Sequence, residues 1–185
     1  MNELARLQAS QELRILDTPA EDVFDSAAPQ AASICNTPIA LPSLIDGHRQ
    51  WSKVYIGLDV QETPRHLTFC AHAILDQRLL EGQGSLTDEC FAGNALVTGN
   101  PGIRFYAGMP MFTVDGMVLG TLCVIDHAPR KRDARQRASM QDLAILATAL
   151  SESRKAAAES TQLGLIHNKA FDEILVLCPG SQHIQ

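Results

Sequence analysis

Hydrophobic positions switch between helical and strand-like spacing along this chain. Residues 3–16 carry apolar side chains separated by charged ones, which predicts an amphipathic helix that ends before Pro19, since a residue preceding proline avoids helical geometry. A second helix is expected over residues 20–35, with an apolar face on one side. Pro29 lies inside that pattern and should kink or split the helix.

The next apolar segments have the character of strands. Residues 38–47 and 49–57 are separated by a short turn at Asp46, which predicts an antiparallel hairpin. Pro42 falls within the first of these strands. Because proline cannot donate a ladder hydrogen bond, it is expected only at a sheet edge or at a bulge.

The middle of the chain alternates short elements with loops. Residues 58–68 are polar and indicate a loop, while residues 69–75 predict a short helix. Residues 78–103 are rich in Gly, Asn, Asp and Thr, and predict a long loop with one helical turn near residues 90–96. Loops of this length in compact domains are often functional.

The strongest hairpin signal follows. Apolar runs over residues 103–113 and 118–126 flank Asp115 and Gly116, a pair that favours a tight turn. Asp133 is placed to cap a final helix reaching about residue 160. Tight turns between paired strands imply an antiparallel sheet with helices packed on it, which is an α+β fold.

Composition narrows the function classes. The chain has 185 residues and a net charge of −6, with 45% hydrophobic residues, as expected for one globular domain. An acidic chain is not expected to bind nucleic acid or an anionic membrane, because both need clustered cations. The N-terminus lacks a secretory pattern and no apolar run approaches the ~18–20 residues of a membrane span. We therefore expect a cytoplasmic protein whose five cysteines are free thiols.

Six ordered segments then carry a family resemblance. LRILDTP, DGHRQW, GLDVQETPR, FCAHAI, NALVTGNPGIRFYAG and LGTLCVID resemble GAF domains of bacterial sensor histidine kinases and diguanylate cyclases, over roughly residues 4–150. The resemblance implies a GAF-like central antiparallel sheet with the N- and C-terminal helices on one face. It also implies a ligand pocket on the other face, closed by the short helix and the long loop. A signalling role and a homodimer formed through the terminal helices are implied as well.

The resemblance divides the chain into a GAF domain at residues 1–158 and a C-terminal tail at 159–185. The tail faintly resembles the start of a diguanylate cyclase domain, but the metal- and nucleotide-binding half of a cyclase is absent from the sequence. A continued helix with a frayed end is the alternative interpretation of the tail. Residues 79–86 lack the β-rich run that the family has there, so an altered sheet edge is expected.

Eight residues are candidates to line the pocket. They were chosen as aromatic, polar-tipped or apolar side chains on its expected walls: Trp51, Phe69, Cys70, His72, Leu96, Arg104, Tyr106 and Cys123. Arg104 and Tyr106 share one face of a strand, so Arg104 would hold an anionic ligand group if that face lines the pocket. The alternative for Arg104 is a surface ion pair with an acid such as Asp88. His72 is alternatively a hydrogen-bonded structural histidine.

These observations favour a regulatory domain that senses an unidentified small molecule, with no catalytic residue and no metal site. No glycine motif indicates a phosphate-binding loop, and no motif identifies a cofactor. A second hypothesis is a thiol enzyme resembling free methionine sulfoxide reductase. It would use Cys70, Cys90 and Cys123, of which Cys90 lies in the polar loop. A ligand-free dimerisation scaffold is the third.

Overall fold

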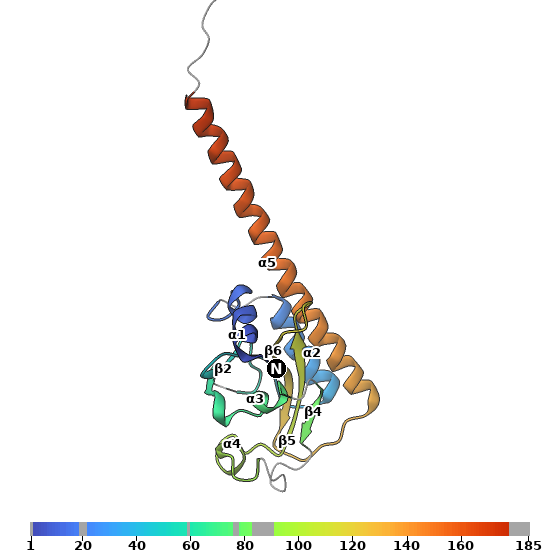
Figure 1. Cartoon of the computed structure of the whole chain (residues 1–185). Helices are drawn as coiled ribbons and strands as arrows, with labels where there is room; N and C mark the ends of the chain where they lie inside the picture. The colour runs from blue at the N-terminus through green and yellow to red at the C-terminus, as the bar shows by residue number, and fades with distance from the viewer. Residues whose placement is uncertain (1, 19–21, 59, 76–77, 83–90, 178–185) are drawn as a thin grey trace, which may run out of the picture.

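The computed structural model describes residues 2–18, 22–58, 60–75, 78–82 and 91–177. A six-stranded antiparallel sheet in the order β3-β2-β1-β6-β5-β4 forms the centre of the domain (Figure 1). The strands are β1 (Ile39–Ile45), β2 (Arg49–Ser52), β3 (Glu62–Pro64), β4 (Leu80–Gly82), β5 (Phe105–Phe112) and β6 (Val118–Asp126). The helices are α1 (Glu3–Glu12), α2 (Asp22–Cys35), α3 (Phe69–Ala73), α4 (Ala95–Thr98) and α5 (Ala134–Leu177), with a 3₁₀ turn at Arg65–Leu67. The α+β class predicted from the sequence is confirmed.

Both predicted hairpins are present. Gly116 takes a φ of 77° in the β5–β6 turn, a conformation that costs glycine little. In the β1–β2 turn, Oδ1 of Asp46 accepts hydrogen bonds from the backbone N–H groups of His48 (2.8 Å) and Arg49 (3.0 Å). The side chain of Asp46 thereby satisfies turn donors that the strands leave unpaired.

The sheet separates two hydrophobic cores. The first contains Phe24 of α2, Met140 of α5, and sheet residues such as Trp51, Phe105 and Leu122. The second lies on the opposite face and contains Phe69 and Ile74 together with sheet residues such as Leu41 and Tyr106. Alternation along each strand assigns neighbouring side chains to different cores. Helices α2 and α5 therefore cover one face, as expected, and α3 lies over the other.

Helix α1 is fixed to one end of the sheet by a buried arginine. The Arg6 side chain is fully buried, and its guanidinium donates to the carbonyl of Ile45 at the end of β1 (2.5 Å). Two further hydrogen bonds of 2.8 Å join it to Glu3. A buried guanidinium needs such partners, since an unpaired buried charge is strongly destabilising. This end of the sheet and α1 are thus joined through polar contacts.

Pro29 does not split the second helix. Helix α2 is continuous from Asp22 to Cys35 with Pro29 inside it. The side chain of Pro29 faces solvent, so the lost helical hydrogen bond lies on the exposed side where water reaches the backbone. The buried face of α2 keeps its regular geometry and packs against α5 and β1.

Pro42 lies in a central strand, and not at the edge of the sheet, because β1 pairs with both β2 and β6. The carbonyl oxygen of Pro42 accepts a hydrogen bond from the backbone N–H of Lys53, just beyond the end of β2. The ring nitrogen of Pro42 therefore also points toward the β2 side of the strand. Leu44 pairs with Trp51 and Ala40 with Ile56, which leaves one extra residue opposite Pro42. The segment that pairs with this part of β1 therefore carries a bulge opposite Pro42. At this point the strands form no regular ladder, so the N–H group that proline lacks is not needed.

Two short edge strands differ from the sequence expectation. Strand β3 lies in the segment expected to be a loop, and β4 lies in the segment expected to lack strand character. Each has three residues, too few to show the alternating pattern that identifies a strand. Both are held by pairing with a neighbour, β3 with β2 and β4 with β5.

Helix α5 begins at the predicted cap and runs further than expected. Asp133 and Gln136 form a reciprocal cap, with backbone-to-side-chain hydrogen bonds of 2.9 and 3.1 Å. The helix continues to Leu177, past the predicted end near residue 160, because no proline interrupts it before Pro179. Its 44 residues correspond to about 66 Å, and its second half extends away from the domain (Figure 1). Among the helices described, none is both long and apolar enough for a membrane span.

Candidate functional site

A cavity of about 460 Å³ lies on the sheet face opposite α2 and α5. Its floor is formed by Leu41 of β1, Tyr106 of β5 and Ile125 of β6. The walls come from the segment leading into β3, from β3 itself, from the start of α3, and from α4 with the residues after it. This volume is in the range typical of small-molecule sites.

Aromatic packing shapes the apolar side of the cavity. Thr68 caps α3 by accepting from the backbone N–H of Ala71 (3.3 Å), and this places Phe69 in the first turn, over the sheet. The Phe69 ring stacks on Phe91 with centroids 4.2 Å apart, and on Tyr106 at 5.0 Å. Such stacking gives Phe69 a fixed orientation in the cavity wall.

One buried polar atom in the cavity has no partner. Gln50 lines the cavity from β2 and is only 7% exposed, yet its Oε1 atom forms no hydrogen bond with any described residue. A buried acceptor without a donor costs free energy, and such atoms in a cavity indicate a missing polar partner. Gln50 therefore contributes a buried, unsatisfied acceptor to the cavity wall.

The remaining polar groups are few and carry little positive charge. Ser52, Glu62 and Thr63 line the cavity from the β2–β3 side, and His127 lines it from the end of β6. Among the described lining residues there is no lysine or arginine. The cavity thus has apolar walls with scattered hydrogen-bonding groups, and lacks the cationic clamp that a phosphate group usually requires.

Two cysteines meet beneath the cavity. Cys70 of α3 lines it, and its Sγ lies 3.7 Å from the Sγ of Cys123 on β6. The Tyr106 hydroxyl lies 3.3 Å from the Cys70 sulfur, and the Cys123 sulfur lies 3.5 Å from the carbonyl oxygen of Leu41. All of these side chains are buried. The two thiols therefore form one hydrogen-bonded cluster with a phenol.

The surroundings make the two thiols unequal. Burial alone would raise the pKa of Cys70, but hydrogen bonds led by that from Cys123 outweigh it and lower the pKa to about 7. The pKa of Cys123 is raised, first by its hydrogen bond to Cys70 and then by burial. Burial also raises the pKa of Tyr106, so that the phenol stays a donor at neutral pH. Of the two thiols, Cys70 is thus the one that loses its proton more readily.

The structure brings together most of the residues selected from sequence. Phe69, Cys70, Leu96 and Tyr106 line the cavity, and Cys123 lies directly behind Cys70. Cys90 and Asp88, named in the alternatives, lie outside the described residues. The selection by motif therefore identified the α3 side of the cavity.

Three selected residues lie elsewhere. Trp51 points to the helix-covered face, since its neighbours Gln50 and Ser52 point into the cavity. The Arg104 guanidinium donates a hydrogen bond to the carbonyl of Val97 in α4 (2.8 Å), and Arg104 is not among the residues that line the cavity. His72 is exposed, with its ring edge against Phe91 at 5.1 Å between centroids.

Sequence reasoning missed the β2–β3 side of the cavity. Gln50, Glu62, Thr63 and His127 line it and were not selected. The strand alternation around Trp51 is the signal that would have found Gln50, because a buried tryptophan assigns its neighbours to the other face. Glu62 and Thr63 belong to the recognisable segment GLDVQETPR, but β3 is too short to show a pattern that would assign their side chains to the cavity.

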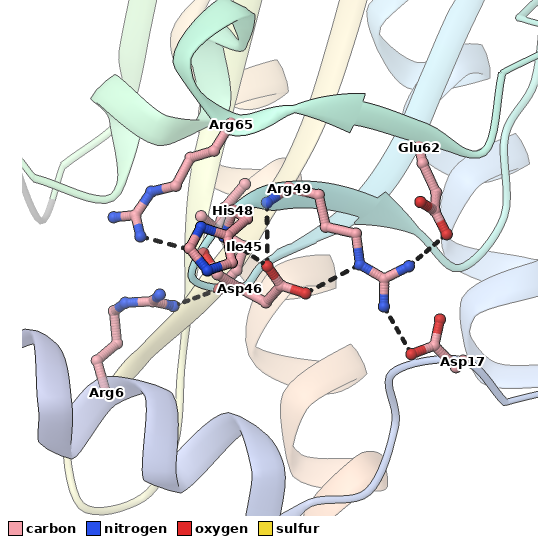
Figure 2. Close-up of polar contacts among 8 residues, drawn as sticks. All are labelled: Arg6, Asp17, Ile45, Asp46, His48, Arg49, Glu62 and Arg65. Carbon is pink, nitrogen blue, oxygen red and sulfur yellow. Dashed lines mark hydrogen bonds and ion pairs between the residues drawn. The ribbon is translucent and has the colours of Figure 1, made fainter.

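An arginine connects this side of the cavity to the N-terminal segment. Arg49 of β2 donates to Asp46 of the β1–β2 turn (2.9 Å) and to Asp17 between α1 and α2 (2.6 Å), and it pairs with Glu62 of β3 (Figure 2). Arg65 lies close by and donates to the carbonyl of Asp46 (3.0 Å). Figure 2 shows the three carboxylates arranged around the Arg49 guanidinium. Arg49 therefore joins β3 to Asp17 through two ion pairs, so that a movement of β3 would alter the contact with Asp17.

Helix α1 is in turn connected to α5. Lys155 of α5 pairs with Glu12 at the end of α1 (3.4 Å), and Arg154 donates to the carbonyl of Leu13 (3.3 Å). Beyond Lys155, the described side chains of α5 up to Leu165 are exposed. The last contacts that α5 makes with the domain are thus with the end of α1.

Comparison with known proteins identifies relatives of this architecture. The GAF domain family model matches residues 12–152. Over 119 residues, 64% of this chain, the sequence is 46% identical to a cyclic di-GMP phosphodiesterase of Pseudomonas aeruginosa, of which the match covers 20%. The chain thus corresponds to about a fifth of that relative's length.

Solved structures support the fold. The GAF domain of an Acinetobacter phosphoenolpyruvate-protein phosphotransferase superposes with a TM-score of 0.61 and 15% identity, covering 85% of this chain and 97% of that one. A free methionine-R-sulfoxide reductase of Neisseria meningitidis superposes with a TM-score of 0.58 and 16% identity, covering 79% and 86%. At these identities the likeness concerns the fold alone.

Proposed function

This chain belongs to the GAF domain family, and we propose that it is a regulatory domain of bacterial signal transduction that binds a small molecule in the cavity above β1, β5 and β6. GAF domains are typical of signalling sensors. The proposal assigns the cavity to ligand recognition and α5 to transmission of the signal.

The observation that carries the proposal is a cavity of ligand size whose wall contains the unpartnered oxygen of Gln50. An interior filled by side chains would favour a ligand-free scaffold, whereas a cavity of about 460 Å³ with an unsatisfied acceptor favours an occupant. A ligand that donates a hydrogen bond to Gln50 would remove the cost of burying that oxygen.

The lining restricts the chemistry of the ligand. Phe69 and Tyr106 offer aromatic surface, while Gln50 and Thr63 offer hydrogen-bonding groups. Glu62 is the acidic residue of the described lining and is already paired with Arg49, while no lysine or arginine belongs to that lining. We therefore propose a neutral molecule with a flat apolar part and at least one donor, and not a nucleotide held by its phosphates.

Signal transmission is proposed to run from β3 to α5. A ligand contacting Glu62 or Thr63 would change the position or dynamics of β3, and Arg49 joins Glu62 to Asp17. From the end of α1, the contact between Glu12 and Lys155 reaches α5. These contiguous contacts support coupling through the terminal helices; ligand-dependent exchange in α1 would demonstrate it.

The proposed output is control of an attached or associated signalling enzyme. The Pseudomonas relative is named a cyclic di-GMP phosphodiesterase, which supports an output in cyclic di-GMP turnover. The exposed part of α5 supports a homodimer, since Leu146 and Leu150 are 54% and 41% exposed on one side of the helix. A change in the pairing of two such helices would reach a partner domain without contact to the ligand.

A fractionated metabolite extract tests the ligand proposal. Fractions that raise the melting temperature of the full chain would be collected and then offered to Gln50→Leu, which keeps the side-chain volume but removes the acceptor. We expect the variant to unfold at the same or a higher temperature alone and to lose at least about tenfold in ligand affinity, as for a buried hydrogen bond of about 1.5 kcal/mol. Equal stabilisation of both proteins by every active fraction would contradict the proposed site.

A further inference from the structure

The pair of cysteines beneath the cavity has the arrangement of a reactive dithiol. Cys70 belongs to the cavity wall, and Cys123 lies behind it at 3.7 Å between sulfur atoms, 53 residues away in sequence. A disulfide needs about 2.05 Å, so the sulfur atoms would have to approach by about 1.7 Å. Rotation of two side chains and a small shift of the short helix α3 can supply such a movement.

We propose that Cys70 and Cys123 form a redox-active site that small hydroperoxides oxidise to an intramolecular disulfide, in which Cys70 reacts first and Cys123 resolves the product. This function is separate from ligand sensing by the same cavity. It requires that a molecule the size of hydrogen peroxide enters the cavity and reaches the buried sulfur of Cys70 in its wall.

The cluster around Cys70 is arranged to hold a negative charge. The Tyr106 hydroxyl can donate to the Cys70 thiolate at 3.3 Å, and Cys123 can donate its S–H at 3.7 Å. Ser43 and Thr121 add two buried hydroxyls near the sulfur atoms, and both act to lower the pKa of Cys70. The contacts from Tyr106 and Cys123, with these hydroxyls nearby, favour the thiolate, which is the reactive form of cysteine.

The chemistry balances with the peroxide as oxidant. The Cys70 thiolate attacks one peroxide oxygen and the O–O bond breaks, giving Cys70 sulfenic acid and hydroxide, which takes a proton from solvent to become water. The Cys123 sulfur then attacks the Cys70 sulfur, the S–O bond breaks, and the proton of Cys123 leaves with the hydroxyl as a second water. Two thiols lose two electrons in total, and the peroxide gains them.

Cys35 provides an internal comparison. It is buried on the opposite, helix-covered face of the sheet, and burial raises its pKa. Its thiol therefore ionises less readily near neutral pH than that of Cys70, whose pKa is lowered. Allowing for the lower intrinsic nucleophilicity of a low-pKa thiolate, we expect Cys70 to react at least about fivefold faster than Cys35.

Peptide mapping can identify the product without ambiguity, because the five cysteines lie in five different tryptic peptides. The full chain at pH 7 would be treated with one equivalent of hydrogen peroxide, blocked with N-ethylmaleimide in denaturant, digested and analysed by mass spectrometry. We expect residues 66–78 joined to residues 105–130 by a disulfide, with Cys35 alkylated. Alkylation of both Cys70 and Cys123, or a disulfide from Cys70 to another cysteine, would overturn the proposal.

Two variants separate the roles of the cluster. Cys123→Ala should stop the reaction at Cys70 sulfenic acid, which dimedone traps; absence of the adduct in folded protein would contradict the proposed order. Tyr106→Phe keeps both thiols but removes one donor to Cys70. It should slow peroxide oxidation several-fold and move the midpoint of the rate–pH profile upward, and an unchanged profile would count against the role of the phenol.

Discussion

Gly108 provides the space that the side chain of Tyr106 occupies. A Cβ atom added at Gly108 would lie 2.1 Å from the Tyr106 hydroxyl oxygen and 2.7 Å from Cζ of its ring. The phenol lies across the backbone of its own strand, and this orientation brings its hydroxyl to Cys70. Cavity floor and thiol cluster therefore depend on the absence of a side chain at position 108.

Gly108→Ala is expected to lower the free energy of unfolding by about 1–3 kcal/mol, because Tyr106 is fully buried and must be displaced. Chemical denaturation measures the change. The matched control is Gly82→Ala in the neighbouring strand, where an added Cβ meets nothing within 4 Å, and which should change stability by less than about 0.5 kcal/mol. The penalty should shrink when Tyr106→Leu is combined with Gly108→Ala. An equal penalty in both backgrounds would show that the ring is not the obstacle.

Arg49→Ala tests the connection between β3 and the N-terminal segment. The three ion pairs are partly exposed, so a loss of about 1 kcal/mol in stability is expected. Hydrogen exchange should accelerate around Asp17 and in β3 together. Arg137→Ala, which removes a partly exposed ion pair to Glu81, is the control and should leave exchange around Asp17 unchanged. Faster exchange in only one of the two segments would contradict the connection.

Acid should weaken the attachment of α1. Hydrogen bonds led by that from Arg6 lower the pKa of Glu3 from 4.5 to about 2. A carboxyl group whose pKa is lower in the folded state stabilises fully above its unfolded pKa, and this contribution is lost as the pH falls toward the folded pKa. The stability difference between wild type and Glu3→Gln should therefore be constant above about pH 5 and shrink between pH 4.5 and 2.

Urea unfolding at several pH values measures this difference. Glu159→Gln is a suitable control, since Glu159 is exposed on α5 and lies 4.0 Å from Lys155. Its difference from wild type should be small throughout this range. A Glu3→Gln difference that does not change with pH would contradict a charged Glu3 in the folded protein.

The terminal helices are expected to form a dimer. Leu146 and Leu150 lie one turn apart beside a groove between α2 and α5, which Ala27 also lines. Replacing both leucines by glutamate should convert a dimer into a monomer while the melting temperature of the domain changes little, because these positions are exposed. Light scattering measures the mass. Val114→Glu, at an 87% exposed turn position, should leave the dimer intact, and a monomeric wild type would refute the expectation.

Local signals in the sequence account for much of the fold. Asp115 and Gly116 between two apolar runs specify the β5–β6 hairpin, and Asp133 specifies the start of α5, because turns and caps depend on neighbouring residues. The order of the sheet, with β1 next to β6, results from pairing across 80 residues of chain and has no local signal. The family resemblance implied a central antiparallel sheet with the terminal helices on one face, but not the order of its strands.

Only part of the candidate site could be predicted from the sequence, because the rest depends on contacts between distant segments. Phe69, Cys70, Tyr106 and Glu62 all belong to segments that carry the family resemblance. Glu62, however, lies in a strand of three residues, which is too short to show which way its side chain points. The contact between Cys70 and Cys123 is created by packing α3 on the sheet; the sequence names both for a thiol enzyme together with Cys90 but does not show that these two meet. Trp51 shows the opposite error, since a large aromatic residue was assigned to the cavity although it belongs to the helix-covered core.

Native mass spectrometry of the chain purified from the cells that produce it is the most direct test of small-molecule binding in the cavity. The account predicts a non-covalent adduct of a few hundred daltons on wild type and on Ile145→Trp, which places the new ring on an exposed position of α5. It predicts loss of that adduct from a folded Leu96→Trp variant, whose ring would occupy the cavity. An adduct that Leu96→Trp retains as fully as Ile145→Trp would contradict the assignment of the cavity as the binding site.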